Sequence, residues 1–195
     1  MLIAVDTNVL LDHANNDDDV MDAVATIRRR LPAARLVVTP TVIGELVALY
    51  ERGDRSEQKA AEKALTRMRE WGYEPLNLVA VAHGIVEQIG LTLRLKGALP
   101  DEEANDGCVI AEAALLGARV LLTADAHMLE AQEHPLFKKS SATATWKATI
   151  SSSPHRAKSS AAFFKGDNPA SQLSTFNTQL SHATHRIPRR TQPGL

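Results

Sequence analysis

Two short apolar runs end in the same way, and both predict buried strands. Residues 2–5 are apolar and are followed at once by Asp6. Residues 120–123 form a second run, which reaches Asp125 two positions later. Short continuous runs of this kind are typical of strands in a parallel sheet that is covered on both faces.

Helical periodicity fills most of the chain between these runs. The predicted helices cover residues 20–31, 40–52, 56–71 and 81–96, and a further helix contains Asp106 and ends at Gly117. Residues 36–39 predict another strand, after which Thr39 is expected to cap the helix that begins at Pro40. Residues 76–79 are compatible with a short strand or a loop. Strands that alternate with helices predict an α/β fold with a mostly parallel sheet.

This arrangement of strands and helices makes several acidic residues candidates for a functional site. The carboxyl ends of parallel strands meet at one edge, where α/β proteins bind ligands, so Asp6 and Asp125 are expected to lie together there. Two helices can add Glu45 and Asp106. Each acid alone is also explained by helix capping or by the helix dipole. Capping does not account for all four acids together.

The order of these motifs resembles that of the PIN-domain nucleases, many of which are toxins of bacterial toxin–antitoxin pairs of the VapC type. The motifs are Val5-Asp6-Thr7-Asn8, Glu45 on a helix after a strand, Asn105-Asp106 before an apolar helix, and Leu122-Thr123-x-Asp125. The resemblance covers about residues 1–130 and implies a three-layer α/β/α domain with a mostly parallel central sheet. It also implies that an acidic metal site is formed by Asp6, Glu45, Asp106 and Asp125, with Thr7, Asn8 and Thr123 as polar support.

The chemistry of such a site follows from its charge. Four carboxylates directed at one point repel one another unless a hard divalent cation lies among them. Oxygen ligands favour Mg²⁺ or Mn²⁺, and a metal-bound water of lowered pKa can attack a phosphodiester. The residues therefore predict a metal-dependent enzyme that hydrolyses phosphodiester bonds, and the resemblance implies an endoribonuclease with a toxin role. RNA as the substrate, an antitoxin protein as a partner and a homodimer are implied by the resemblance alone.

Two other functions stay open at this point. A phosphatase can use an aspartate at a strand end as its nucleophile, as haloacid-dehalogenase-type enzymes do, but their motif needs a second acid where this chain has Asn8. A non-catalytic PIN-like scaffold that binds RNA or protein is the other alternative. Retention of four mutually repelling acids argues against a site without function.

Charge divides the chain into two parts. Residues 1–137 contain 13 Lys+Arg and 22 Asp+Glu, a net charge of −9, whereas residues 138–195 contain 9 and 1, a net charge of +8. We therefore expect a PIN-like nuclease domain in residues 1–137 and a basic, Ser/Thr-rich tail in residues 138–195. The tail contains no Val and is predicted to be largely disordered, although residues 143–150 alternate enough for one edge strand.

Several residue types narrow the range of possible functions. The single cysteine, Cys108, excludes an internal disulfide and is expected to be a buried structural thiol. No apolar run approaches a membrane span and no signal sequence is recognised, so a cytoplasmic protein is expected. His127 is expected at the surface or lining a pocket. Asp101, Glu102 and Glu103 rank below Asp106 as candidates for the metal site, because acidic residues at the start of a helix usually only interact favourably with the helix dipole.

Overall fold

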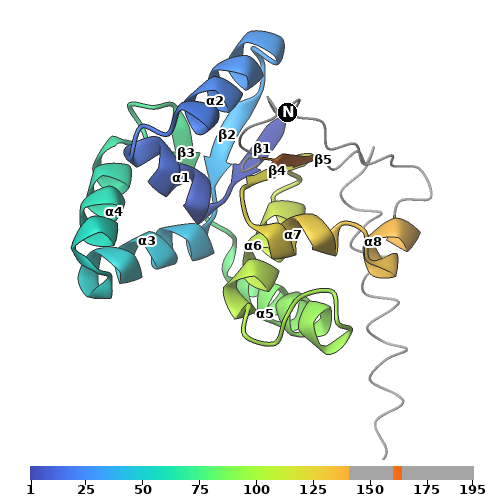
Figure 1. Cartoon of the computed structure of the whole chain (residues 1–195). Coiled ribbons are helices and arrows are strands. Elements are labelled where there is room, and N and C mark those ends of the chain that lie inside the picture. Colours follow the sequence, from blue (N-terminus) through green and yellow to red (C-terminus); the bar gives the residue numbers. More distant parts are fainter. Residues whose placement is uncertain (141–159, 164–195) are drawn as a thin grey trace, which may run out of the picture.

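The computed structural model describes residues 1–140 and 160–163 of the chain, which form one sheet with helices around it (Figure 1). The strands are β1 (Leu2–Val5), β2 (Arg35–Val38), β3 (Tyr73–Pro75), β4 (Val120–Thr123) and β5 (Ser160–Phe163). The helices are α1 (Thr7–Ala14), α2 (Asp18–Arg30), α3 (Pro40–Arg52), α4 (Arg55–Arg67), α5 (Ala80–Leu95), α6 (Ala104–Leu115), α7 (Ala126–Ala131) and α8 (Pro135–Ser140).

The first strand of the chain lies at the centre of the sheet. The strand order is β3-β2-β1-β4-β5, and the pairs among β1 to β4 are all parallel. The chain moves outward from β1 to β3 and then crosses to the other side of β1 to form β4. This reversal places a topological switch point between β1 and β4, where α/β proteins bind ligands beyond the carboxyl ends of the strands. The predicted α/β class with a mostly parallel central sheet is confirmed.

The third strand lies earlier than the sequence pattern indicated. Residues 76–79 were the candidates, but β3 is Tyr73–Pro75, and its register pairs Leu36 with Tyr73. The Tyr73 side chain is 1% exposed, and its hydroxyl lies 2.7 Å from Nδ1 of the buried His13, whose ring stacks on Trp71. Burial of this aromatic ring selects Tyr73, rather than the leucines that follow it, for the sheet.

One strand comes from the basic segment of the chain. β5 pairs antiparallel with β4, in a register that sets Thr123 opposite Ser160. The late edge strand expected at residues 143–150 lies outside the described residues, as does the rest of the segment apart from 138–140 and 160–163. α8 crosses the predicted boundary at residue 137. The sheet of the amino-terminal body therefore includes residues beyond that boundary.

The helix that carries Glu45 begins where predicted but is capped differently. Thr39 is the N-cap residue of α3, yet its hydroxyl makes no capping hydrogen bond, and Thr39 Oγ1 is buried without a hydrogen-bond partner among the described residues. Val42 and Leu46 form its buried side, whereas the Tyr50 side chain is 49% exposed. By contrast, the next helix, α4, begins with a capping box formed by Asp54 and Glu57.

The buried core follows the strands and the facing sides of the helices. The fully buried members include Ile3, Leu10, Val37, Leu46 and Val109. These side chains fix β1 and β2 against helices from both halves of the chain. In the part of the chain that the structure describes, none of the helices is both long and apolar enough to cross a bilayer.

Candidate active site

Asp6 lies directly beyond the end of β1 and is 4% exposed. Its Oδ1 accepts a hydrogen bond of 2.7 Å from the Thr7 backbone N–H, so it caps α1, and its Oδ2 accepts one of 2.7 Å from the Thr123 hydroxyl. Asp6 therefore both caps α1 and belongs to the group of acids at this edge of the sheet. The two hydrogen bonds fix both carboxylate oxygens between β1 and β4.

The pKa of Asp6 is raised to about 6. Burial is the largest cause, since a desolvated carboxylate is less stable as the anion. The hydrogen bonds from Thr123 and Thr7 lower the pKa, and the negative charges of Glu45 and Asp125 raise it. Glu45, on the helix that follows β2, and Asp125, beyond β4, therefore act electrostatically on Asp6.

Glu45 approaches Asp6 through a threonine. The Thr7 hydroxyl, which is buried at the start of α1, donates a hydrogen bond to Glu45 Oε2 on α3. Thr7 thereby contacts two of the predicted acids, one through its backbone N–H and one through its side chain. Asn8, which is also expected to support the site, is exposed on α1.

Asp125 lies two residues beyond β4 and caps α7. Its Oδ1 accepts from the backbone N–H groups of His127 at 2.7 Å and Met128 at 3.3 Å. Its own N–H donates to Thr123 Oγ1 at 3.0 Å, and the same hydroxyl donates to Asp6. Thr123, which is 1% exposed, is therefore the direct link between the two strand-end acids.

Asp106 lies in the first turn of α6 and carries the clearest sign of an unmet interaction. Its Oδ2 is buried and has no hydrogen-bond partner among the described residues. Burial raises the pKa of Asp106 to about 7, and nearby acids add to the effect. The charges that act on it, in decreasing order, are those of Asp125, Asp6, Glu103 and Glu45. A buried acceptor without a donor is costly, so this oxygen is suited to a cation or a proton.

The four predicted acids therefore share one electrostatic environment at the carboxyl edge of the sheet. They do not converge on one point: within residues 1–140 and 160–163, no three His, Cys, Asp or Glu side chains lie close enough to hold a metal ion together. Glu103, the N-cap residue of α6, belongs to the same environment although the sequence ranked it below Asp106.

The raised pKa of Asp106 gives a test that needs no substrate. Its folded pKa of about 7 exceeds the ordinary 3.8, so its contribution to stability is fully present below pH 3.8 and is lost as the pH rises through 7. In EDTA, wild type should therefore lose stability relative to Asp106→Asn as the pH rises from 3.8 to about 7. Urea unfolding of both proteins measures this difference and cancels the titration of groups that do not interact with Asp106. A difference that does not change with pH contradicts the assignment.

Two further groups, the carboxyl of Glu112 and the thiol of Cys108, lie on α6, the helix that carries Asp106. Glu112 on α6 is 2% exposed, and no motif or spacing in the sequence distinguishes it. Cys108 is half-buried, and burial, followed by the charges of Glu112 and Glu87, raises the pKa of its thiol. A thiol of raised pKa is a poor nucleophile, which agrees with the predicted structural role.

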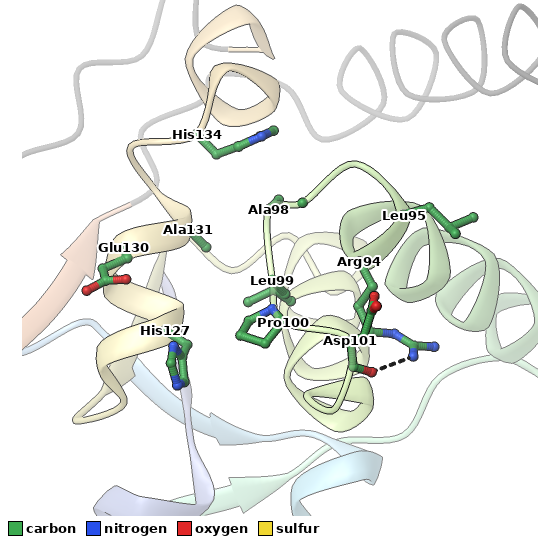
Figure 2. A pocket seen from close by; sticks show the side chains of 11 residues that line it. Arg94, Leu95, Ala98, Leu99, Pro100, Asp101, His127, Glu130, Ala131 and His134 are labelled. Carbon is green, nitrogen blue, oxygen red and sulfur yellow. Dashed lines mark hydrogen bonds between the residues drawn. The ribbon is translucent and has the colours of Figure 1, made fainter.

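A groove of about 760 Å³ lies between the loop that joins α5 to α6 and helix α7 (Figure 2). Its walls include Arg94, Asp101, His127 and His134. Arg94 donates a hydrogen bond of 2.9 Å to the Asp101 carbonyl oxygen, which holds this loop against α5. The prediction that His127 lies at the surface or lines a pocket agrees with its exposed position in this wall.

Fold and site together define an α/β protein whose acids gather at the switch point of a parallel sheet. The sequence matches the family model of the PIN domain over residues 3–133, and the chain belongs to this family. It therefore has the PIN nuclease-type fold, as the resemblance implied.

The solved structures agree with this assignment. A chain in the crystal structure of VapBC2 from Rickettsia felis bound to a DNA fragment from their promoter is similar, with a TM-score of 0.52 and 17% sequence identity. The match covers 69% of this chain and 94% of that chain. At this identity the likeness concerns the fold alone. No curated protein matches the sequence significantly.

Proposed function

We propose that the protein is a metal-dependent endoribonuclease. The observation that carries the proposal is the meeting of Asp6, Glu45, Asp106 and Asp125, from four segments of a PIN domain, in one electrostatic environment that raises the pKa of Asp6 and Asp106. Such groups favour either protons or a cation. The donor set consists of oxygen atoms, which suits Mg²⁺ or Mn²⁺.

The fit of a divalent cation is supported by the buried and unpartnered Oδ2 of Asp106. Asp106, Asp6, Asp125 and Glu45 would hold the ion, which when bound supplies a water of lowered pKa and a positive charge for a phosphate. Thr123 and Thr7 keep the Asp6 oxygens oriented, and Thr7 also restrains Glu45. These threonines thus reduce the freedom that the acids lose when a substrate is bound.

The test is cleavage of mixed RNAs by the purified full-length protein with Mg²⁺, with Mn²⁺ and with EDTA. We expect cleavage with either metal and none with EDTA. A protein that binds RNA equally well in all three conditions without cleaving it is a non-catalytic scaffold, and the proposal is then wrong.

We also propose a toxin role, which the fold likeness to a VapBC2 chain supports. A toxin has to be neutralised in its host, and an Arg or Lys side chain of an antitoxin can replace the positive charge of the metal among the acids. Exposed apolar side chains on α3 and α5, such as Tyr50 and Leu95, are available for an antitoxin or for a second copy of the chain. Expression of the intact protein alone should arrest growth. Harmless expression of a cleavage-competent protein would remove the toxin role and leave the nuclease role.

The negative charge of residues 1–137 raises the question of how RNA is held. Phosphate contacts need cations, and the carboxyl-terminal segment supplies a cluster in Arg186, Arg189 and Arg190. Replacement of all three by Gln keeps β5 and should make the slope of log K against log salt less steep by up to about 2, at about 0.7 for each contact on single strands. Binding is best measured in the Asp6→Asn background, where RNA stays intact. An unchanged slope shows that these arginines make no phosphate contact.

A further inference from the structure

A buried glutamate joins the two helices that carry Glu45 and Asp106. Glu112 on α6 is 2% exposed, and its Oε2 accepts a hydrogen bond of 3.0 Å from the Thr41 backbone N–H in the first turn of α3. A buried carboxylate is costly unless it is hydrogen-bonded, so its presence in an otherwise apolar part of α6 calls for an explanation.

The amino end of α3 has no capping side chain of its own. The Thr39 hydroxyl makes no capping bond, and Pro40 has no N–H to satisfy. The Thr41 N–H is therefore the first donor of the helix, and Glu112 receives it from another helix. The negative side chain also complements the positive end of the α3 dipole.

The position of this hydrogen bond relates it to the acidic edge. Thr41 lies four residues before Glu45, on the same face of α3 and one turn earlier. Glu112 lies six residues after Asp106 on α6, about 9 Å along the helix axis at 1.5 Å per residue. A single hydrogen bond thus connects the turn before Glu45 with the helix of Asp106.

We propose that Glu112 is a positioning residue, which fixes the Glu45 carboxylate relative to the Asp106 carboxylate. The inference rests on the proposed nuclease function. Glu112 is not a catalytic residue, because it is buried and its Oε2 is already engaged by the backbone of α3. Its role is exerted through α3, whose first turn it holds against α6.

Three substitutions separate the parts of this role. Glu112→Gln keeps an acceptor oxygen at the same reach, Glu112→Asp keeps the charge but shortens the side chain, and Glu112→Leu keeps the approximate size and removes the acceptor. The measurements on the full-length protein are hydrogen exchange of the Thr41 amide, Mn²⁺ affinity, and kcat and KM for RNA cleavage. Gln should resemble wild type in all of them. Leu and Asp should show faster Thr41 exchange and at least about tenfold losses in Mn²⁺ affinity and in kcat, in the range of outer-shell changes at metal sites.

A control for general destabilisation is Val24→Ala, because Val24 is a buried residue of α2 that makes no part of the site. This change should lower stability while leaving Mn²⁺ affinity and kcat of the folded protein unchanged. If Leu prevents folding, the comparison of Asp with Gln still tests reach against charge. Wild-type Mn²⁺ affinity and kcat in the folded Leu or Asp variant overturn the role of Glu112 alone. Absence of both Mn²⁺ binding and cleavage in the wild-type chain overturns the nuclease function together with it.

Discussion

Replacement of Asp6 by Asn is expected to abolish RNA cleavage while the domain stays folded. Asn is as good an N-cap residue as Asp, so α1 keeps its first hydrogen bond from Thr7. The substitution removes a buried negative charge whose pKa is already raised to about 6 by burial and neighbouring acids. Without divalent ions the variant should therefore be equally or slightly more stable than wild type.

The loss of cleavage should exceed the roughly 100-fold effect that an outer-shell change has at a metal site, because a direct ligand is removed. Single-turnover cleavage at saturating Mg²⁺ measures the activity, and urea unfolding in EDTA measures the stability. Asp22→Asn is the matched control, since Asp22 is exposed on α2, and it should change neither. Undiminished metal-dependent cleavage by Asp6→Asn would count against the acidic site. Asp106→Asn and Asp125→Asn should behave like Asp6→Asn, and Glu45→Gln should have a smaller effect.

Replacement of Gly107 by Ala is expected to damage both stability and cleavage. A Cβ atom at Gly107 would lie 2.9 Å from Gly90 Cα and 3.1 Å from the Gly90 carbonyl oxygen. These are backbone atoms of α5, so α5 and α6 have to separate to admit a methyl group. Overpacking of this kind costs about 1–3 kcal/mol, against a gain in helix propensity of about 1 kcal/mol. Asp106 precedes Gly107 directly and moves with it.

A matched glycine on α5 provides the control. Nothing lies within 4 Å of a Cβ atom built at the exposed Gly84, so Gly84→Ala should raise the midpoint of unfolding. Gly107→Ala should lower it and should reduce kcat for RNA cleavage. If both alanine variants are equally stable, the close helix crossing does not constrain α6.

The sequence predicted the parts of the fold that depend on local pattern. Leu2–Val5 and Val120–Thr123 are strands because continuous apolar runs are needed in a sheet covered on both faces. Since both strands are parallel, the positions of Asp6 and Asp125 at one edge followed directly. The helices that carry Glu45 and Asp106 supplied two further candidates, and the family resemblance implied that all four acids form one site. The charges of Asp125, Asp6 and Glu45 all act on Asp106.

The residues that were missed depend on contacts between distant segments. Glu112 follows an apolar run in the carboxyl-terminal part of α6, where a glutamate is an ordinary helix-forming residue, and its partner is a backbone N–H on another helix. β3 was placed too late because Leu76 and Leu78 alternate as strand residues do, whereas the buried contact of Tyr73 with His13 decides the register. Neither contact leaves a periodic signal in the sequence.

The central position of β1 has a consequence for synthesis on the ribosome. Ile3 of β1 pairs with Val120 of β4, and Asp125 follows β4. The first strand to be synthesised can therefore pair with β4 only after more than a hundred further residues have been added. At about 5–20 residues per second, roughly 6 to 24 s pass between the addition of Asp6 and that of Asp125. Nascent chains in this interval lack Asp125 and a complete β4, which is one of the two strands that pair with β1. The proposed cleavage should therefore begin only with chains that extend past β4, and premature stop codons before Asp125 should yield products without this activity.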